Sequence, residues 1–248
     1  MSKFFTVGDE QITELILDEA ARVIERGDLI VLPTDTVYGI GADAFSPRAV
    51  EDLLEAKRRG RDMPPPVLIP RVETLQGIAS DVPDDALKLV GEYWPGPLTI
   101  ICNAQPSLDW DLGDTHGTVG VRVPDNETAL ALLRQTGPMA VSSANLSGMP
   151  PAKTAAEARD QLDDSIALYL EAGESGGREP STIVDCTVSP MRVLRSGGLS
   201  IDALREVVPS ILDLGEEPPS EPTVEEEAGD ESGDSNPDEP KRADQEAG

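Results

Sequence analysis

The chain has 248 residues, 47 of them acidic and 20 basic, with one histidine and a formal net charge of −27. This balance argues against a large nucleic-acid footprint, which needs a basic face, and two cysteines are too few for a disulfide scaffold or a cysteine zinc site. No apolar run approaches the ~20 residues of a membrane helix and the first residues lack a signal-peptide core, so we expect a cytoplasmic protein without membrane contact.

Helix and strand signals alternate along most of the chain. Apolar residues recur on one face of residues 9–26 and Gly27 follows as a stop, which predicts a helix. Ser46 and Pro47 suit the cap and first turn of a helix through Arg59, ended by Gly60. Further helices are expected over 83–93, over 125–136 (Asp125 as cap, Gly137 as stop) and over 200–207. Apolar and β-branched runs predict strands over 28–32, 67–69, 97–103, 118–123, 138–142, 166–170, 182–186 and 191–195.

This order of elements predicts one α/β (α+β) domain over residues 1–209. Several predicted strands follow one another directly, which favours a mixed sheet covered by helices over a purely parallel one. Residues 210–248 are expected to form an acidic, disordered tail, because Glu216–Gly248 carry 13 acidic against two basic residues and almost no large apolar side chain. Without that stretch, residues 1–215 still carry a net charge of −16.

The segment LPTDTVYGIG, residues 32–41, has the composition of a ligand site at the end of a strand. A buried apolar run opens into Thr34, Asp35 and Thr36, followed by Tyr38 and two glycines. The alternative is a strand, a turn and a second strand, in which these polar side chains satisfy turn amides. The residue types alone leave both interpretations open.

A dense basic run, Lys57-Arg58-Arg59-Gly60-Arg61, follows the helix predicted after Ser46. Cations complement the negative end of a helix dipole, but this effect accounts for only one or two of the four basic residues. A cluster this short suits a triphosphate better than a long nucleic acid. An RNA-binding module that uses Lys57–Arg61 is the non-enzymatic alternative.

Other polar groups stand at predicted strand ends or, for Ser181-Thr182, at a predicted strand start. They are the segment Val141-Ser142-Ser143-Ala144-Asn145, the arginines Arg122 and Arg195, and the pair Ser181-Thr182. Serine, asparagine and arginine donate hydrogen bonds to phosphate and carboxylate oxygens, and an arginine on an apolar strand needs a bound anion or a buried carboxylate. No P-loop and no G-x-G-x-x-G pattern is present, and the lone His116 is a weak basis for a histidine-dependent mechanism or metal site.

Together these segments resemble the YrdC-type threonylcarbamoyl-AMP synthase family, in its short single-domain form. The resemblance covers about residues 9–208 and rests, in order, on LPTDTVYGIG, the K-x-R of Lys57 and Arg59, TVGVRVP, SSANLSG, EPSTIVD and VLRSGG. It implies a twisted mixed sheet flanked by helices around a concave, positively charged cavity. It also implies synthesis of threonylcarbamoyl-AMP and pyrophosphate from L-threonine, bicarbonate or CO2, and ATP, with transfer by partner proteins to tRNA beside the anticodon. A related alternative is a carbamoyl-adenylate-forming maturation enzyme.

The resemblance also implies roles for individual residues. Threonine would contact Thr34, Thr36, Arg122, Val141 and Ser181, and ATP would contact Lys57, Arg59, Thr118, Ser143, Asn145 and Arg195. Lys57, Arg59 and Arg195 would be catalytic, with Mg2+ carried by ATP and no dedicated metal site. The chain departs from the family pattern at Met63 (usually Asn), near Leu68 (usually His) and at Pro151 (often Ser), and Arg61 is a candidate to compensate.

Overall fold

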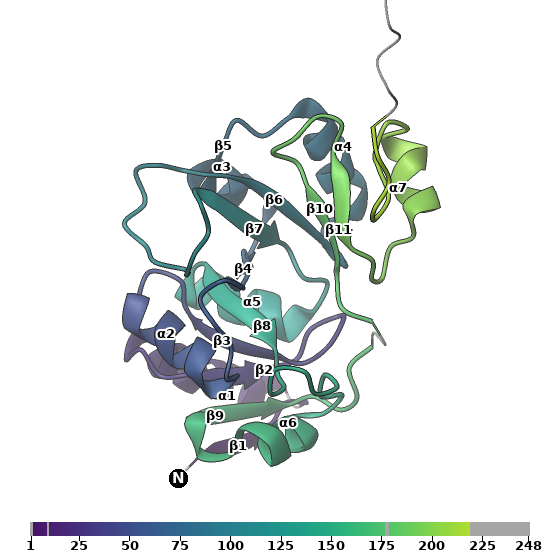
Figure 1. The fold of residues 1–248 in the computed structure, drawn as a ribbon. Helices are drawn as coiled ribbons and strands as arrows, with labels where there is room; N and C mark the ends of the chain where they lie inside the picture. Colours follow the sequence, from purple (N-terminus) through teal and green to yellow (C-terminus); the bar gives the residue numbers. More distant parts are fainter. Residues whose placement is uncertain (1, 9, 177–178, 219–248) are drawn as a thin grey trace, which may run out of the picture. The chain divides into compact units, whose positions relative to one another are not determined.

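The computed structural model, which describes residues 2–8, 10–176 and 179–218, is built on one mixed sheet (Figure 1). Its strands run in the order β1-β9-β2-β3-β8-β4-β7-β6-β10-β11, with β5 paired to β6. The pairs β1–β9, β2–β9, β4–β7 and β6–β10 are parallel and the others antiparallel, so the predicted mixed sheet is confirmed. The strands are β1 (Lys3–Thr6), β2 (Ile30–Leu32), β3 (Gly39–Asp43), β4 (Val67–Leu68), β5 (Ala79–Ser80), β6 (Leu98–Ala104), β7 (Thr118–Arg122), β8 (Met139–Ser143), β9 (Leu168–Glu171), β10 (Thr182–Asp185) and β11 (Arg192–Arg195).

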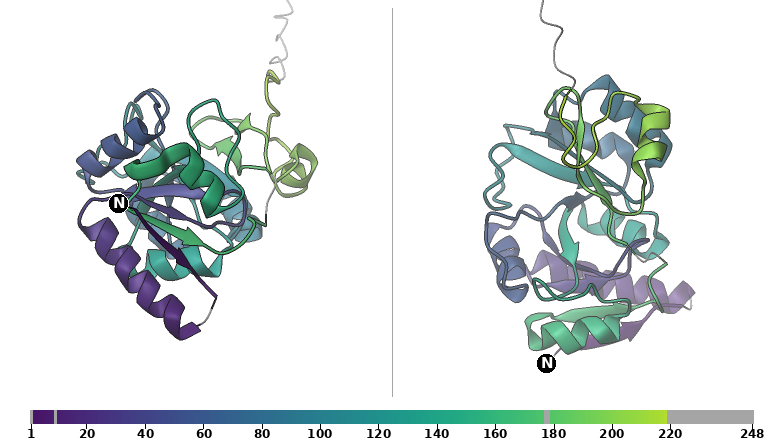
Figure 2. Two further views of the ribbon diagram at one scale, coloured as in Figure 1. Left: turned by 90° about the horizontal axis from the view of Figure 1, so that it is seen from below. Right: turned by 45° about the vertical axis from the view of Figure 1, so that its right-hand side comes forward.

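Helices cover the sheet on both faces (Figure 2). They are α1 (Glu10–Glu25), α2 (Pro47–Ala56), α3 (Leu75–Ile78), α4 (Asp84–Tyr93), α5 (Glu127–Thr136), α6 (Ala155–Leu162) and α7 (Ile201–Val207), with 3-10 turns at Val72–Thr74 and Asp163–Ser165. Helices α1 and α5 bury their apolar faces with β2, β8 and β9 in one core cluster, and α2 and α6 form a second with β2, β3 and β9. A third cluster joins α4 and α7 to β6, β7 and β10. Burial of these apolar faces is the main favourable term that holds the layers together.

All five predicted helices are present, with two corrections at their ends. Helix α2 stops at Ala56, so the basic run lies in the loop after the helix instead of in its last turn. Helix α5 is capped by Asn126 and not by Asp125, because the Asn126 side chain accepts a hydrogen bond from the Ala129 amide. Gly137 ends α5 as predicted, with a φ of 79°.

Strand β3 was not among the strands predicted from apolar runs, because it contains two glycines, although the strand-turn-strand alternative for LPTDTVYGIG implied it. A Cβ atom on Gly39 would lie 2.6 Å from Val141 Cγ1, and one on Gly41 would lie 2.6 Å from the end of Met139. A side chain at position 39 would therefore clash with the branched Val141 of β8, whereas one at position 41 would require the end of Met139 to move. The last three residues of LPTDTVYGIG begin β3, and residues 33–38 between β2 and β3 form a loop.

The compact unit extends to Glu217, beyond the boundary expected at residue 209. Ile211 and Leu212 are buried, and the Leu212 amide and carbonyl form hydrogen bonds with the main chain of Met191 and Val193. Arg205 of α7 forms an ion pair with Glu216. Residues 210–217 thus belong to the folded domain, whereas the disorder predicted for the acidic tail concerns residues 219–248, which lie outside the described residues.

Candidate active site

The polar segments singled out above meet at one cavity of about 140 Å3. Its wall comes from the loop after β2, the loop between α2 and β4, the ends of β7, β8 and β11, and the start of β10. All five predicted threonine residues and three of the predicted ATP residues line it: Thr34, Thr36, Arg122, Val141 and Ser181, with Arg59, Ser143 and Arg195. Convergence of strand ends explains how segments far apart in sequence share one site.

Arg122, at the end of β7, is a buried cation, and each of the three nitrogens of its guanidinium donates a hydrogen bond within the protein. Nε donates to the Gly96 carbonyl at 2.9 Å, Nη1 to Thr36 Oγ1 at 2.9 Å, and Nη2 to Asp35 Oδ1 at 2.6 Å. The Asp35 carboxylate is the buried partner that an arginine on an apolar strand requires. Burial lowers the pKa of Arg122 and the adjacent Asp35 raises it. Asp35 was not among the predicted site residues, although its place between Thr34 and Thr36 was a signal for it.

The hydroxyls of Thr34 and Thr36 lie 3.1 Å apart beside this guanidinium. Thr34 Oγ1 donates to the Val37 carbonyl at 2.6 Å and accepts from the Thr36 amide at 3.2 Å. Both residues are buried; the Thr34 hydroxyl forms hydrogen bonds within the loop, and the Thr36 hydroxyl also accepts one from Arg122. The interpretation as a turn and the interpretation as a ligand site are therefore both correct in part.

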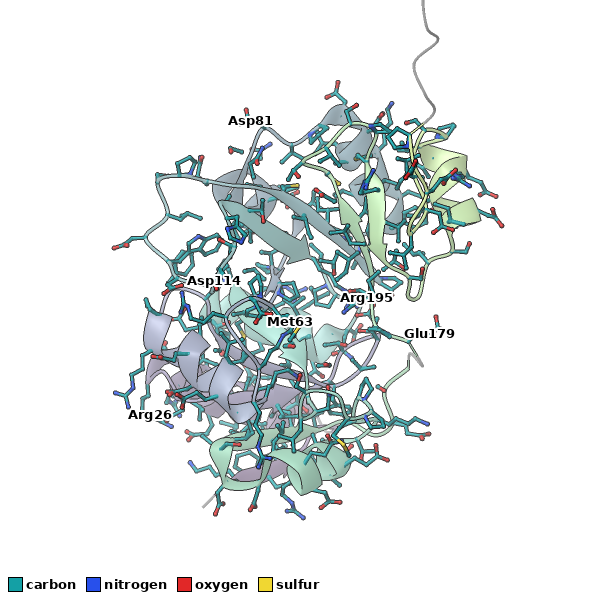
Figure 3. All side chains as sticks on the ribbon, viewed as in Figure 1. Arg26, Met63, Asp81, Asp114, Glu179 and Arg195 are labelled. Carbon is teal, nitrogen blue, oxygen red and sulfur yellow. The ribbon has the colours of Figure 1, made fainter. Side chains whose placement is uncertain are left out.

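Arg195 lies at the lower end of β11 in Figure 3 and is fixed by Ser181. Its Nε and Nη2 donate to the Ser181 carbonyl at 3.1 and 2.8 Å, and Nη2 also contacts Ser181 Oγ at 3.1 Å. Ser181 Oγ is 2.7 Å from the hydroxyl of Thr99, a buried cavity residue that the sequence reasoning missed. Gly197 packs against the Pro180–Ser181 main chain, so this glycine serves a contact within the chain.

The cavity has a positive lining, as the resemblance implied. Arg59, Arg122 and Arg195 line it, and no carboxylate does so among the described residues. Burial lowers the pKa of Arg195, and the nearby charges of Arg122 and Arg59 lower it further. Arg59 Nη1 donates to Ser142 Oγ at 3.0 Å, while its buried Nε has no partner in the described part of the chain. Three crowded guanidiniums with spare donors are suited to an anionic ligand.

Three predicted ATP residues do not line this cavity. The Lys57 amine is buried behind the wall and donates to the main-chain carbonyls of Ser143 and Asn145, the latter at 2.8 Å. Burial, and then the charge of Arg59, lower the pKa of Lys57 to about 8. The Asn145 amide group donates to the Leu146 and Met149 carbonyls, and its buried Oδ1 has no partner within the described ranges. Thr118 lines a small neighbouring pocket that shares Pro64, Pro66, Thr99 and Ile183 with the cavity.

The basic run is divided between the interior and the surface, where Arg58 and Arg61 are exposed, so it does not form one continuous patch for an RNA-binding module. Lys57 is 2% exposed and Arg59 points into the cavity. Arg61 forms ion pairs with Asp111 and Asp114 at 2.7 and 3.5 Å, on the loop before β7, so it is engaged away from the cavity. Of the positions that depart from the family pattern, Leu68 lines the cavity, whereas Met63 and Pro151 are exposed.

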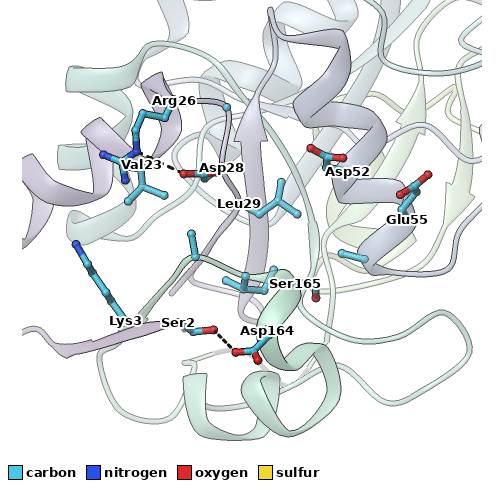
Figure 4. Close-up of a pocket in the computed structure, with 14 residues that line it drawn as sticks. Ser2, Lys3, Val23, Arg26, Asp28, Leu29, Asp52, Glu55, Asp164 and Ser165 are labelled. Atoms are coloured by element: carbon cyan, nitrogen blue, oxygen red, sulfur yellow. Dashed lines mark hydrogen bonds and ion pairs between the residues drawn. The ribbon is translucent and has the colours of Figure 1, made fainter.

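A larger hollow of about 690 Å3 lies elsewhere, beside the end of α1 and the start of β2 (Figure 4). It is lined by four carboxylates and two cations, Lys3 and Arg26, and both cations are paired, with Glu19 and Asp28 respectively. Its charge does not suit an anionic substrate.

None of the helices in the described part of the chain combines the length and the apolar character that a membrane span requires.

Comparison with known proteins gives a consistent assignment. The family model Sua5_yciO_yrdC, described as "Telomere recombination", matches residues 22–197. A relative from Mycobacterium tuberculosis (strain ATCC 25618 / H37Rv) is 49% identical over 208 residues, which is 84% of this chain and 96% of the relative. The "Threonylcarbamoyl-AMP synthase" of Bacillus subtilis (strain 168) is 35% identical over 216 residues, 86% of this chain and 62% of that protein.

The fold also matches solved structures. The crystal structure of Pyrococcus abyssi Sua5 complexed with L-threonine superposes with a TM-score of 0.79 at 33% identity, and the match covers 86% of this chain and 62% of that one. The chain therefore spans about three fifths of the length of this longer relative. By the family model and by these relatives, the chain belongs to the Sua5/YciO/YrdC family.

Proposed function

We propose that this chain is a threonylcarbamoyl-AMP synthase, which makes threonylcarbamoyl-AMP and pyrophosphate from L-threonine, bicarbonate or CO2, and ATP. The observation that carries the proposal is the single cavity lined by all five predicted threonine residues together with Arg59, Ser143 and Arg195. Relatives that bear the name of this activity support it. Downstream proteins that transfer the threonylcarbamoyl group to tRNA are the expected partners, and ATP, L-threonine and bicarbonate are the expected substrates.

The chemistry needs positioning and charge more than a protein nucleophile. The attacking oxygen belongs to the N-carboxylated amino acid, which is already an anion at neutral pH, so no general base has to activate it. The difficulty is to bring this anion to the α-phosphate against the charge of the triphosphate. Arg59 and Arg195 would offset that repulsion in the cavity, and Lys57 would add positive potential from behind its wall.

Magnesium fits this proposal as a companion of ATP. Among the described residues, no three His, Cys, Asp or Glu side chains gather into a group that could hold a metal ion. We expect the cation to be held by the phosphates, where its charge neutralises part of theirs. The protein's own contribution is the fixed positive charge of the arginines.

The test is threonine-dependent release of pyrophosphate. Purified protein with ATP, Mg2+ and bicarbonate should release pyrophosphate and form the adenylate, detected by mass spectrometry, when L-threonine is present and not when it is omitted. Arg195→Ala should lower the rate by more than tenfold, because loss of a donor to transition-state charge costs about 2–4 kcal/mol. Arg48→Ala, which removes a guanidinium that is 91% exposed, is the matched control. Absence of the adenylate from wild-type reactions would overturn the proposed function.

A further inference from the structure

The two cysteines of the chain, Cys102 and Cys186, lie opposite each other on neighbouring strands of the sheet. Cys102 belongs to β6, and Cys186 directly follows the last residue of β10. The two strands are parallel, with Ile101 paired to Asp185, and the Cys186 amide donates to the Ile101 carbonyl at 2.9 Å. This hydrogen bond continues the ladder by one residue, so Cys186 is paired with Cys102.

The side chains of the two cysteines share one face of the sheet, because paired residues of neighbouring strands point the same way. Both lie in one core cluster, where Cys102 is 1% and Cys186 is 3% exposed. A hydrogen bond with the Cys186 thiol lowers the pKa of Cys102, whereas burial raises it. The same hydrogen bond and burial raise the pKa of Cys186. Cys102 is therefore the thiol of the pair that ionises first, and the thiolate is the reactive form of cysteine.

The separation of the two residues is within the range of a disulfide bond and near its lower limit. Paired residues of neighbouring strands have Cα atoms about 4.8 Å apart, and disulfides join Cα atoms that are about 4.4–6.8 Å apart. The Cβ atoms of a disulfide are only about 3.8 Å apart, which is less than the spacing between strands. Formation of the bond therefore draws β6 and β10 together at this point.

The same two strands carry part of the cavity wall, three residues before the cysteines. Thr99 of β6 is paired with Ile183 of β10, and both residues line the cavity. Thr99 Oγ1 is 2.7 Å from the hydroxyl of Ser181, the residue before β10 that fixes Arg195. A shift of one strand against the other reaches this contact through ~10 Å of continuous strand. A displacement of about 1 Å in a positioning contact can lower a rate by up to about 100-fold.

We propose that Cys102 and Cys186 are a redox-sensitive pair, and that their oxidation to an intramolecular disulfide by a peroxide lowers the activity of the enzyme. The Cys102 thiolate attacks hydrogen peroxide, the O–O bond breaks, and a sulfenic acid and hydroxide form. The Cys186 sulfur then attacks the sulfenic sulfur: the S–S bond forms, the S–O bond breaks, and the thiol proton leaves with the hydroxyl group as water. Over both steps the thiols lose two electrons and two protons, and the peroxide becomes two molecules of water. A dithiol reductant reverses the change by thiol–disulfide exchange.

The first measurement is the intact mass of the wild-type protein after exposure to hydrogen peroxide without denaturant. We expect the loss of two hydrogen atoms, protection of both cysteines from alkylation, a monomer on a non-reducing gel, and recovery of the original mass with dithiothreitol. Addition of oxygen to one sulfur without the loss of two hydrogen atoms would overturn the proposal. A disulfide that forms only after urea has unfolded the protein would overturn it too, because the native arrangement would then not support the bond.

The second measurement is the rate of threonine-dependent pyrophosphate release by the same samples. The oxidised wild-type protein should be about threefold slower or more, and dithiothreitol should restore the rate. Cys102→Ala and Cys186→Ala, which each keep one thiol, should retain their own rates after the same treatment. A full rate in the oxidised protein, or equal inhibition of the alanine variants, would overturn the proposal, and the comparison of oxidised with reduced wild-type protein needs neither variant. Absence of the adenylate from reduced wild-type reactions would instead concern the proposed function, on which only this second measurement depends.

Discussion

Lys57 is an unusual residue for an enzyme that handles anions, because its buried amine contacts main-chain carbonyls and no carboxylate. Burial lowers its pKa to about 8 from an ordinary value of 10.5, so the amine loses its charge within a pH range that assays can reach. Below pH 8 the charged amine adds positive potential behind the cavity, and above pH 8 this potential is lost. Bound ATP favours the charged form, so we expect the KM for ATP to rise by up to about tenfold per pH unit above 8.

The measurement is the KM for ATP between pH 7 and pH 9.5 at saturating L-threonine. Lys57→Arg keeps a cation at all these pH values and should give a flat profile over this range. Lys3→Met, which changes an exposed lysine outside the cavity, should retain the wild-type profile. A KM that is constant across the range in the wild-type enzyme, or that rises equally in Lys57→Arg, would contradict a role for the Lys57 charge.

The sequence predicted the positions of some side chains at the site and not those of others. The residues that the family resemblance assigned to threonine all line the cavity, and the local pattern of hydroxyls and an arginine that interrupt apolar strands had pointed to a ligand site there. The positions of Lys57 and Asn145 behind the wall could not be predicted, since they depend on how the loop after β8 folds against the end of α2. The ion pair of Asp35 with Arg122 joins residues 87 positions apart, a separation that no local pattern reveals.

At the scale of elements, the start of α5 offers a direct test of the corrected helix cap. Asn126 Oδ1 accepts from the Ala129 amide at 3.0 Å, whereas Asp125 makes no such bond. Asn126→Ala should lower the free energy of unfolding by about 1 kcal/mol, the usual cost of losing a cap. Asp125→Ala, the neighbouring control, should cost less than half as much. Urea denaturation of the two variants measures both values, and equal losses would mean that the cap assignment is wrong.

Elements with a periodic pattern were predictable and those without one were not. Helix α1 has a clear apolar stripe and a glycine stop, and the structure ends it at Glu25, close to the expected residue 26. Strand β3 lacked a strand pattern because of its glycines, of which Gly39 packs against the branched side chain of Val141 in β8. Helix α6 is short, and its Thr154 cap, followed by Glu157, was the available signal for it.

At the scale of the whole molecule, an acidic protein encloses a positive cavity. The formal net charge is −27, yet three arginines line the site. The family resemblance implied this positive cavity, whereas the acidic composition argued only against a large basic face. A negative exterior slows the approach of ATP and is screened by salt, whereas the buried arginines are screened much less. The local arrangement of charge, and not its sum, therefore decides which ligand binds.

The limit of the folded domain is the last feature that sequence composition misplaced. The composition changes gradually after α7, so the end of the domain was placed at Pro209, although the apolar residues Ile211 and Leu212 follow it. Both side chains are at most 5% exposed, and Leu212 pairs with the main chain beside β11. Truncation after Pro209 removes these contacts and the Arg205–Glu216 ion pair. We expect it to lower the free energy of unfolding by about 3–6 kcal/mol, in line with the loss of two buried aliphatic side chains.

Truncation after Glu217 provides the matched comparison, because it keeps every one of these contacts. That variant should retain the melting temperature within about 2 °C and the specific activity of the full chain, since it removes none of the apolar burial described here. The double substitution Ile211→Ala, Leu212→Ala in the full chain should reproduce most of the loss seen after truncation at Pro209. If truncation after Pro209 left stability unchanged, residues 210–217 would not belong to the domain. A large loss of activity after truncation at Glu217, with stability intact, would instead assign the acidic segment a part in catalysis.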